Sequence, residues 1–260
     1  MNKLKHSLVL AGLLAAPAGV MAAEPAPSPH TITANVGLYS QYVFRGITQT
    51  GEDPALQGGL DYAHASGFYV GVWGSNVSWL EDYQGYSKGS LEIDIYAGFR
   101  NSIGNTGLTY DLGILRYQYP GDRPAGITNA NTTELYAALG WKWFTAKYSH
   151  SISDETFGFA NSRGSSYIDL SVSVPIADTG LTAGAHYGKQ DYDGAANDPF
   201  DYEDWKVSLA YDLGKLSDVT KGMTLGVAYT DTDAKKLPYT DANGLYMGDS
   251  QTTVWISKTF

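Results

Sequence analysis

The feature that most constrains the fold is an alternation of apolar and polar residues that runs through most of the chain beyond residue 31. Leu91, Ile93 and Ile95 fall on one face of a strand, for example, while Glu92 and Asp94 fall on the other. A period of two is typical of β-strands whose faces meet different surroundings. No segment of comparable length repeats its apolar residues at the 3.6-residue spacing of a helix. The chain is therefore predicted to be all-β.

About twelve alternating segments can be counted. They are residues 31–48, 55–65, 67–79, 89–101, 107–119, 132–142, 143–152, 165–175, 180–191, 202–213, 222–232 and 250–260. Most connections after even-numbered segments are short and most after odd-numbered ones are long, although residues 50–54 form a brief exception. An even strand number with this alternation of loop lengths is typical of outer-membrane barrels. The sequence predicts a closed antiparallel transmembrane β-barrel with short periplasmic turns and longer extracellular loops.

Composition indicates which face of the strands meets lipid. Only 17% of the residues are charged and 13% are aromatic, whereas a soluble domain usually carries roughly 25% charged residues. Aromatic residues lie toward strand ends on the apolar face, as in the girdles of membrane barrels: Phe44, Phe99, Trp141, Trp205 and Tyr211. The apolar face is expected to contact lipid and the polar face to line the lumen.

The N-terminal segment has the pattern of an export signal. Lys3 and Lys5 precede an apolar run at residues 8–19, and small residues follow around Ala22. Residues 1–23 are therefore predicted to be a cleaved signal peptide, residues 24–30 a short linker and residues 31–260 the barrel. The expected location is the outer membrane of a Gram-negative bacterium, in contact with outer-membrane lipids and lipopolysaccharide.

The last segment ends on an aromatic residue, Phe260. A terminal aromatic on an amphipathic strand resembles the signal read by the outer-membrane assembly machinery of Gram-negative bacteria. That machinery is an expected partner.

One stretch near the start of the barrel resembles a known family. Residues 35–49 read NVGLYSQYVFRGITQ, followed by PALQGGLDY at 54–62 and GFYVGVWGSNV at 67–77. These motifs resemble the opening of the TorF porin family, whose members are proteobacterial envelope proteins of about this length. The resemblance covers roughly residues 31–80 closely and the remainder by pattern. It implies an outer-membrane barrel and a pore, without a known solute.

The polar face supplies the candidate lumen residues. The candidates for lining the pore or contacting solute are Gln41, Arg45, Asp61, Glu92, Asp94, Arg100, Glu134, Lys142, Asp169 and Lys206. With Asp111, Asp204, Asp212 and Lys147 added, eight acidic residues meet five basic ones, which favours cations in the lumen. Each residue could instead pair across strands and only support the wall.

Two further expectations concern Arg45, the main candidate among the lumen residues, and the width of the lumen. Arg45 lies on the inward phase of the first segment, where it could pair with a carboxylate or hold an anionic solute. Small residues on the polar face are expected to leave a narrow passage: Gly37, Gly59, Gly98, Gly184 and Gly226.

The predicted function is a channel for passive or weakly selective diffusion of small solutes. No cofactor, metal or catalytic residue is expected: the chain has no cysteine, no G-x-S-x-G or H-E-x-x-H motif, and His186 lies in no evident triad. A net charge of -10 argues against nucleic acid. Two alternatives stay open, a non-conducting structural or adhesin barrel and an outer-membrane lipid-modifying enzyme.

Overall fold

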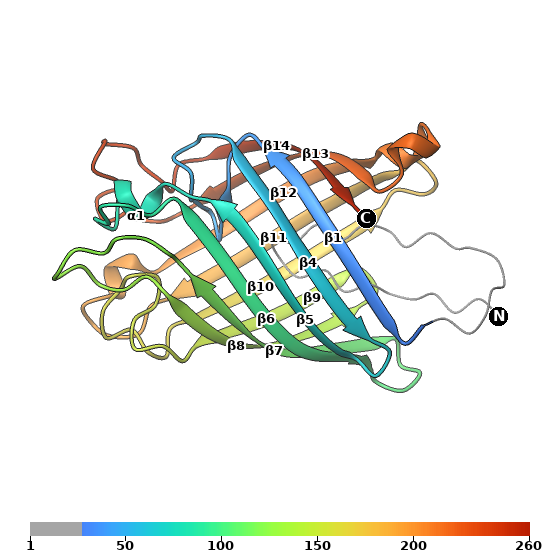
Figure 1. Ribbon diagram of the computed structural model, residues 1–260, viewed down its shortest axis with the longest axis horizontal. Coiled ribbons are helices and arrows are strands. Elements are labelled where there is room, and N and C mark those ends of the chain that lie inside the picture. The colour runs from blue at the N-terminus through green and yellow to red at the C-terminus, as the bar shows by residue number, and fades with distance from the viewer. Residues whose placement is uncertain (1–27) are drawn as a thin grey trace.

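The computed structural model describes residues 28–260, and these form a closed barrel of antiparallel strands (Figure 1). The twelve barrel strands are β1 (His30–Tyr39), β4 (Ala55–His64), β5 (Phe68–Asn76), β6 (Leu91–Ser102), β7 (Leu108–Gln118), β8 (Thr132–Trp141), β9 (Phe144–Ser151), β10 (Ser166–Pro175), β11 (Leu181–Asp191), β12 (Tyr202–Asp212), β13 (Met223–Thr232) and β14 (Gln251–Thr259). The predicted twelve-stranded all-β barrel is confirmed. The proposed signal peptide, residues 1–23, and residues 24–27 of the linker lie outside the described residues.

The connections alternate in length as the sequence predicted. Short turns at residues 65–67, 103–107, 142–143 and 176–180 lie at one end of the barrel, together with a longer turn at 213–222 that contains η2 (Leu213–Lys215) and η3 (Asp218–Thr220). Longer loops at residues 77–90, 119–131, 152–165, 192–201 and 233–250 lie at the other end (Figure 1). Two of them contain α1 (Trp79–Asp82) and η1 (Asp198–Phe200). None of the helices within residues 28–260 is long and apolar enough to cross a membrane.

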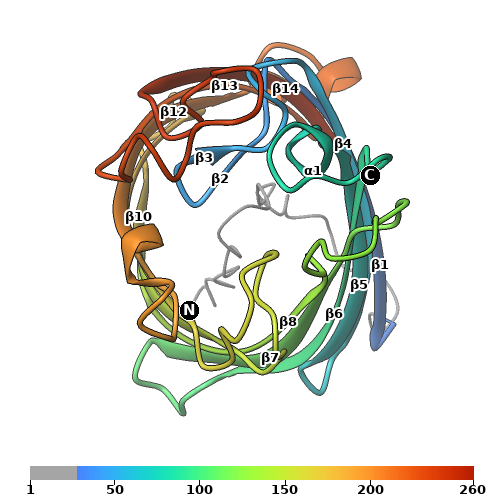
Figure 2. The same cartoon turned by 90° about the vertical axis from the view of Figure 1, so that its left-hand side faces the viewer.

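The first loop differs from the prediction. β1 ends at Tyr39, and residues 40–54 turn into the barrel, where β2 (Val43–Phe44) and β3 (Ile47–Thr48) form a hairpin. Figure 2 shows β2, β3 and α1 inside the ring of strands. Both turn residues of the hairpin, Arg45 and Gly46, have positive φ values of 46° and 81°, as a tight hairpin turn requires.

A hairpin strand alternates as a barrel strand does, which explains the error in the first segment. The expected strand 31–48 therefore combined β1 with the hairpin, and the expectation of a brief connection at residues 50–54 is wrong. Phe44 is also corrected: it lies inside the barrel, with its ring centre 5.7 Å from that of Tyr117, and is not part of an outer girdle.

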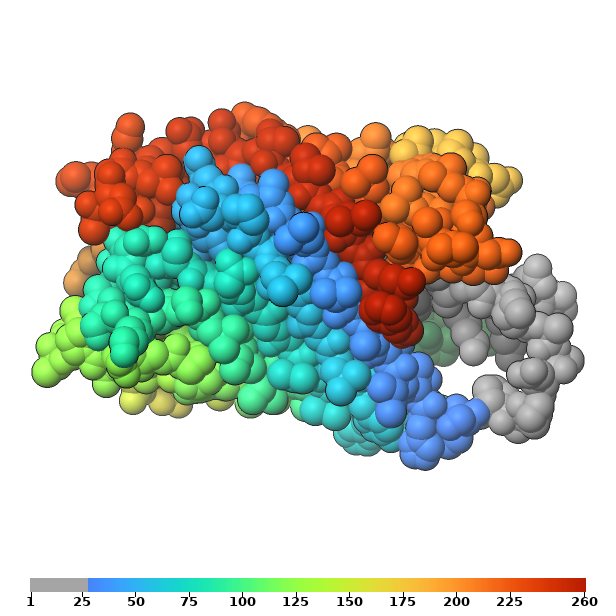
Figure 3. Space-filling view, turned by 45° about the horizontal axis from the view of Figure 1, so that its top comes forward, coloured from blue at the N-terminus to red at the C-terminus, as the bar shows by residue number. Residues whose placement is uncertain are grey.

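Apolar side chains cover the outside of the barrel. On β8, Leu135 and Leu139 are 46% and 56% exposed, whereas Glu134, Tyr136 and Ala138 on the opposite face are buried. The same alternation recurs along the other long strands. Figure 3 shows part of this outside, with β1 in blue lying against β14 in red. The polar face therefore points inward.

Glycines on the inner face make room for aromatic rings of neighbouring strands. Gly226 lies directly opposite Trp255, and a Cβ atom on Gly226 would overlap the indole ring. The same arrangement joins Gly98 to Tyr69, Gly71 to Tyr96 and Gly113 to Tyr136. Trp73 lies less tightly over Gly59, where a Cβ atom would be 3.3 Å from the indole ring. Rings therefore occupy the space over Gly59, Gly98 and Gly226, and the expected narrow passage stays a prediction.

The glycine and ring pairs predict a coupled loss of stability. Gly226→Ala should lower the free energy of unfolding by about 1–3 kcal/mol, because the added methyl group overpacks against Trp255. The loss should shrink when Trp255→Leu removes the ring, which urea unfolding of the single and double variants in lipid vesicles would measure. Equal losses in both backgrounds would contradict this explanation.

Candidate functional site

The candidate site is the lumen around the inward hairpin, defined as residues 40–50. Within the hairpin, the N–H of Gln49 donates to the carbonyl of Tyr42 at 2.7 Å. The N–H of Thr48 donates to the carbonyl of Met247 at 3.0 Å, and the N–H of Ser78 donates to the carbonyl of Gln49 at 2.8 Å. The hairpin is thus tied to two other outer loops and held inside the barrel.

Arg45 lies at the tip of the hairpin and contacts the far wall. Its guanidinium donates to both carboxylate oxygens of Glu134, at 3.0 and 2.8 Å, and to Oε1 of Gln190 at 2.8 Å. The side chains of Arg45 and Glu134 are only 7% and 2% exposed, and Cζ of Arg45 lies 4.2 Å from the ring centre of Tyr167. Arg45 thus reaches the lumen from the hairpin and not from the first strand, and a buried bidentate ion pair fixes its position.

Two carboxylates on β6 lie near the hairpin without a cation beside them. Glu92 accepts a hydrogen bond from the hydroxyl of Tyr42 at 3.3 Å. Glu92 is 1% exposed and Asp94 9% exposed, and neither forms an ion pair with any residue from 28 to 260. One oxygen of each, Oε2 of Glu92 and Oδ1 of Asp94, has no hydrogen-bond partner among these residues. This part of the lumen therefore carries two acidic side chains outside any ion pair.

Tyrosine hydroxyls satisfy two more carboxylates. Tyr96 donates to Oδ1 of Asp61 at 2.6 Å, and Tyr69 donates to Oδ1 of Asp111 at 2.5 Å. Arg100 stacks on Tyr69, with its Cζ 4.9 Å from the ring centre. Because a phenol supplies a hydrogen bond without a positive charge, neither Asp61 nor Asp111 gains an ion pair from its tyrosine.

A histidine on β11 lies between two carboxylates. Nε2 of His186 is 3.0 Å from Oδ1 of Asp204, and Nδ1 is 3.4 Å from Oδ1 of Asp169. The hydroxyl of Ser171 donates to the same oxygen of Asp169 at 2.5 Å and lies 3.2 Å from Nδ1 of His186. Lys206 lies directly opposite His186 in the β11–β12 register. The structure therefore brings two predicted lumen residues, Asp169 and Lys206, close to His186, to which the sequence assigned no role.

Gln41 and Lys142 occupy the edges of the site. Gln41 is 6% exposed at the base of the hairpin, where its Nε2 donates to the carbonyl of Thr252 at 3.3 Å. Lys142 is exposed in the turn between β8 and β9, with φ of 54° and its Nζ 4.7 Å from the ring centre of Trp141. Its expected position inside the lumen is wrong, because the strand alternation stops at this turn. Asp212 likewise caps the turn after β12 by accepting from the N–H of Gly214 at 2.8 Å.

The two halves of the lumen differ in packing. In the half next to the long loops, Thr132, Ser151 and Gln190 are at most 1% exposed. In the half next to the short turns, small residues such as Ser171 and Ser208 on the inner face are half-buried. The outer half is therefore filled by the hairpin and by wall side chains, while the inner half has more open space.

The lumen also contains aromatic residues that the sequence interpretation did not assign to it. Tyr69, Tyr96, Tyr136 and Tyr167 are buried on the inner face. The sequence feature that could have indicated these inward rings is the count of 20 tyrosines, because an outer girdle alone does not require so many. Their cross-strand glycine partners depend on the register, which alternation does not give.

The fold is similar to that of solved porins. For a structure described as "KdgM porin", the TM-score is 0.53 at 8% identity, covering 88% of this chain and 98% of that chain. For "KdgM porin in complex with disordered oligogalacturonate", the TM-score is 0.52 at 8% identity with the same coverage. For Pseudomonas aeruginosa OccD3 (OpdP), it is 0.45 at 14% identity, covering 90% of this chain and 65% of that chain. At these identities the likeness to KdgM shows the fold alone.

The comparisons with sequences point to one family. No curated protein matches the chain. The resemblance of residues 35–49 to the TorF porins stays a prediction, because the matching family model carries another description. That model, "Bacterial protein of unknown function (Gcw_chp)", matches residues 22–260. The chain therefore belongs to the Gcw_chp family.

Proposed function

We propose that this chain is an outer-membrane channel of a Gram-negative bacterium for the diffusion of small solutes, with a mild preference for cations. The observation that carries the proposal is the closed barrel with apolar side chains outside and charged ones inside. A barrel of this kind satisfies every strand edge and exposes a hydrocarbon-compatible surface, as a membrane requires. Outer-membrane lipids and lipopolysaccharide would surround it.

The cation preference rests on the balance of charges in the lumen. The acidic residues on the inner face are Asp61, Glu92, Asp94, Asp111, Glu134, Asp169 and Asp204, and the Lys and Arg residues are Arg45, Arg100, Lys147 and Lys206. The positions of Lys142 and Asp212 at turns remove one base and one acid from the predicted set. Even with His186 charged, the acids are in excess, and such an excess raises the local concentration of cations.

A polyanionic solute fits this lumen poorly. The similar KdgM porin was solved with oligogalacturonate, whose sugar units carry carboxylates. In this chain the guanidinium of Arg45 is already occupied by Glu134 and Gln190, and acids predominate around it. Oligogalacturonate is therefore not a solute that this lumen favours.

The alternative of a lipid-modifying enzyme finds little support in the lumen. Ser171 lies near His186, but its hydroxyl donates to Asp169. A hydrolytic triad needs a histidine nitrogen that accepts the serine proton, whereas both nitrogens of His186 face carboxylates. These side chains also lie on the inner face, away from the lipid-facing surface. A structural or adhesin barrel would carry no current, and this absence of conductance distinguishes it from a channel.

The C-terminal strand is the proposed contact with the outer-membrane assembly machinery. Phe260 is 68% exposed, and its N–H donates to the carbonyl of Ala34 at 2.8 Å, which holds it beside β1. The terminal aromatic side chain is therefore available at the rim of the barrel. The predicted signal peptide at residues 1–23 would direct export.

Current recordings test the channel directly. Refolded protein in a planar bilayer should give discrete steps, and a salt gradient should give a reversal potential of the sign that indicates cations. Asp61→Asn should move that potential toward zero, because an acidic side chain without an ion pair leaves the lumen. Lys142→Gln, in the exposed turn, is the matched control and should leave the potential unchanged.

Two results would contradict the proposal. A folded barrel that never conducts would favour the structural alternative. A preference for anions would refute the proposed cation preference but not the channel.

The lipid-facing surface makes a separate prediction. Val207 is 47% exposed near the middle of β12. Val207→Arg should destabilise the barrel in vesicles by about 2–4 kcal/mol, measured as a smaller free energy of unfolding, because the charge would meet hydrocarbon. The neighbouring inward substitution Ser208→Arg should cost less. Equal costs at the two positions, measured by urea unfolding, would rule out a membrane-facing outer surface.

The ion pair at the hairpin tip predicts both stability and conductance. Glu134→Gln should cost about 3–5 kcal/mol, because it leaves the buried Arg45 charge without its partner. Adding Arg45→Gln should recover part of this loss and raise the single-channel conductance, since the hairpin is then released from the far wall. Asp154→Asn, which breaks the exposed Arg163–Asp154 pair, is the control without an expected effect. If the stability losses of Glu134→Gln and Arg45→Gln simply add, and the conductance is unchanged, the ion pair does not hold the hairpin against the far wall.

A further inference from the structure

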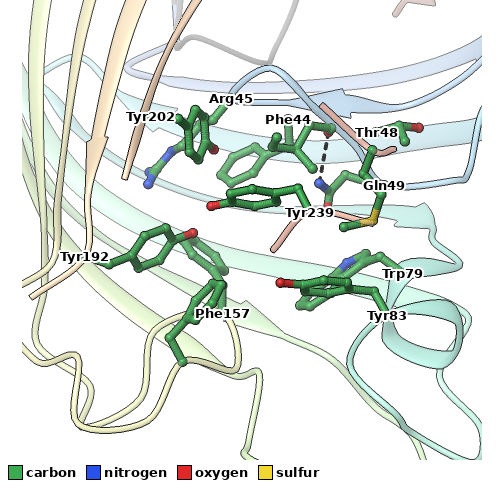
Figure 4. Close-up of a pocket in the computed structure, with 13 residues that line it drawn as sticks. Phe44, Arg45, Thr48, Gln49, Trp79, Tyr83, Phe157, Tyr192, Tyr202 and Tyr239 are labelled. Atoms are coloured by element: carbon green, nitrogen blue, oxygen red, sulfur yellow. Dashed lines mark hydrogen bonds between the residues drawn. The ribbon is translucent and has the colours of Figure 1, made fainter. Parts of the chain in front are cut away.

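A pocket at the outer mouth of the barrel is lined mainly by aromatic rings. They come from the inward hairpin, from α1 and the residue after it, from the loops at 152–165, 192–201 and 233–250, and from the first residue of β12. The cavity is about 50 Å³, room for roughly four water molecules, and it is partly open. Figure 4 shows Phe44 and Tyr239 above Trp79 and Tyr83, with Tyr192 and Phe157 on the other side.

The rings are held in fixed orientations. Tyr83 and Tyr239 lie parallel, with an interplanar angle of 5° and centroids 6.5 Å apart. The hydroxyl of Tyr83 donates to the carbonyl of Pro238 at 2.8 Å, and that of Tyr239 to the carbonyl of Phe200 at 2.6 Å. Burial raises the pKa of Tyr83 to about 12 and that of Tyr239 well above its ordinary value. Both phenols are therefore neutral. Tyr239 is 3% exposed, so its ring is held in place and loses little entropy when a ligand binds.

One hydrogen-bond donor in the pocket is unused. Trp79 lines the pocket and is 7% exposed, and its Nε1–H has no partner among residues 28–260. A buried N–H is normally paired, because an unpaired one loses its hydrogen bonds to water. The pocket therefore suits a ligand that brings an acceptor oxygen, and a pure hydrocarbon would leave this donor unsatisfied.

The charges around the pocket select a neutral ligand. Arg45 lines it, but its donors are committed to Glu134 and Gln190. An anion would find no free guanidinium and would meet the acidic lumen below. A cation would lie beside the guanidinium, whose Cζ is already 4.8 Å from the ring centre of Phe44 and 5.5 Å from that of Phe157.

We propose that this pocket binds a neutral sugar ring, which stacks on the aromatic faces and accepts a hydrogen bond from Trp79. A pyranose has an apolar C–H face and hydroxyl oxygens, so it matches both features. The cavity holds one edge of the ring, and the rest of the sugar lies in the open mouth. The proposal rests on the proposed channel function, for which the site is the point of solute entry.

Calorimetric titration of the detergent-solubilised barrel tests this site without any current. Maltotriose should bind saturably, and more tightly than galacturonic acid or benzyl alcohol. Trp79→Phe keeps the ring but loses the donor, and should weaken binding about fivefold, the loss of one hydrogen bond. Tyr239→Leu should weaken it about tenfold, because the apolar area that the ring covers on the sugar is lost. Trp205→Phe, on the outer surface, is the matched control and should bind as the wild type does.

Several outcomes would overturn the proposal. They are absence of saturable maltotriose binding, tighter binding of galacturonic acid or benzyl alcohol, and unchanged binding in Trp79→Phe. Circular dichroism and heat-dependent gel mobility establish that each variant is folded, and Trp79→Phe keeps the test valid if Tyr239→Leu does not fold. A barrel that binds maltotriose but carries no current would refute the channel alone, and one that conducts without binding would refute only this site.

Discussion

The pairing of β1 with β14 is the contact on which the rest of the structure depends. It joins residues from Asn35↔Thr259 to Tyr39↔Trp255 and turns an open sheet into a closed barrel. Without it, two strand edges would expose unpaired N–H and C=O groups, which favour aggregation in water and are not tolerated in hydrocarbon. Closure also separates two surfaces, so that the apolar side chains gather outside and the polar ones share one lumen.

The lumen then takes the place of a hydrophobic core. Its interior is packed by tyrosine and tryptophan rings that lie over glycines of the adjacent strand, and by hydrogen bonds from phenols to carboxylates. The inward hairpin completes this packing, since its Arg45 pairs with Glu134 on the far wall. Buried ion pairs contribute specificity of position more readily than stability. In this chain the pair sets where the hairpin lies, and so how much of the outer half is filled.

Sequence alternation predicted the parts of the fold that depend on local pattern. Residues such as Leu135 and Leu139 could be assigned to the outer face because strand side chains alternate regardless of tertiary context. The hairpin could not be separated from β1 in this way, since Phe44 and Arg45 continue the same period through a turn. The placement of Lys142 failed for a similar reason, at the point where a strand becomes a turn. The contact of Arg45 with Glu134 joins the hairpin to the far wall, which no local pattern predicts. The contact of His186 with Asp204 depends on the register of the neighbouring strands β11 and β12, which alternation does not give.

The central claim is that the apolar face meets lipid while the polar face surrounds the lumen, and spin labels test it most directly. The chain has no cysteine, so single substitutions along β13 each introduce one labelling site. In lipid vesicles, spin labels at Leu225→Cys, Val227→Cys and Tyr229→Cys should be highly accessible to oxygen, which dissolves in lipid. Labels at Thr224→Cys, Ala228→Cys and Thr230→Cys should be much less accessible to oxygen. An alternation with a period of two is the predicted result. Uniform accessibility to a water-soluble nickel complex at all six positions would contradict the account.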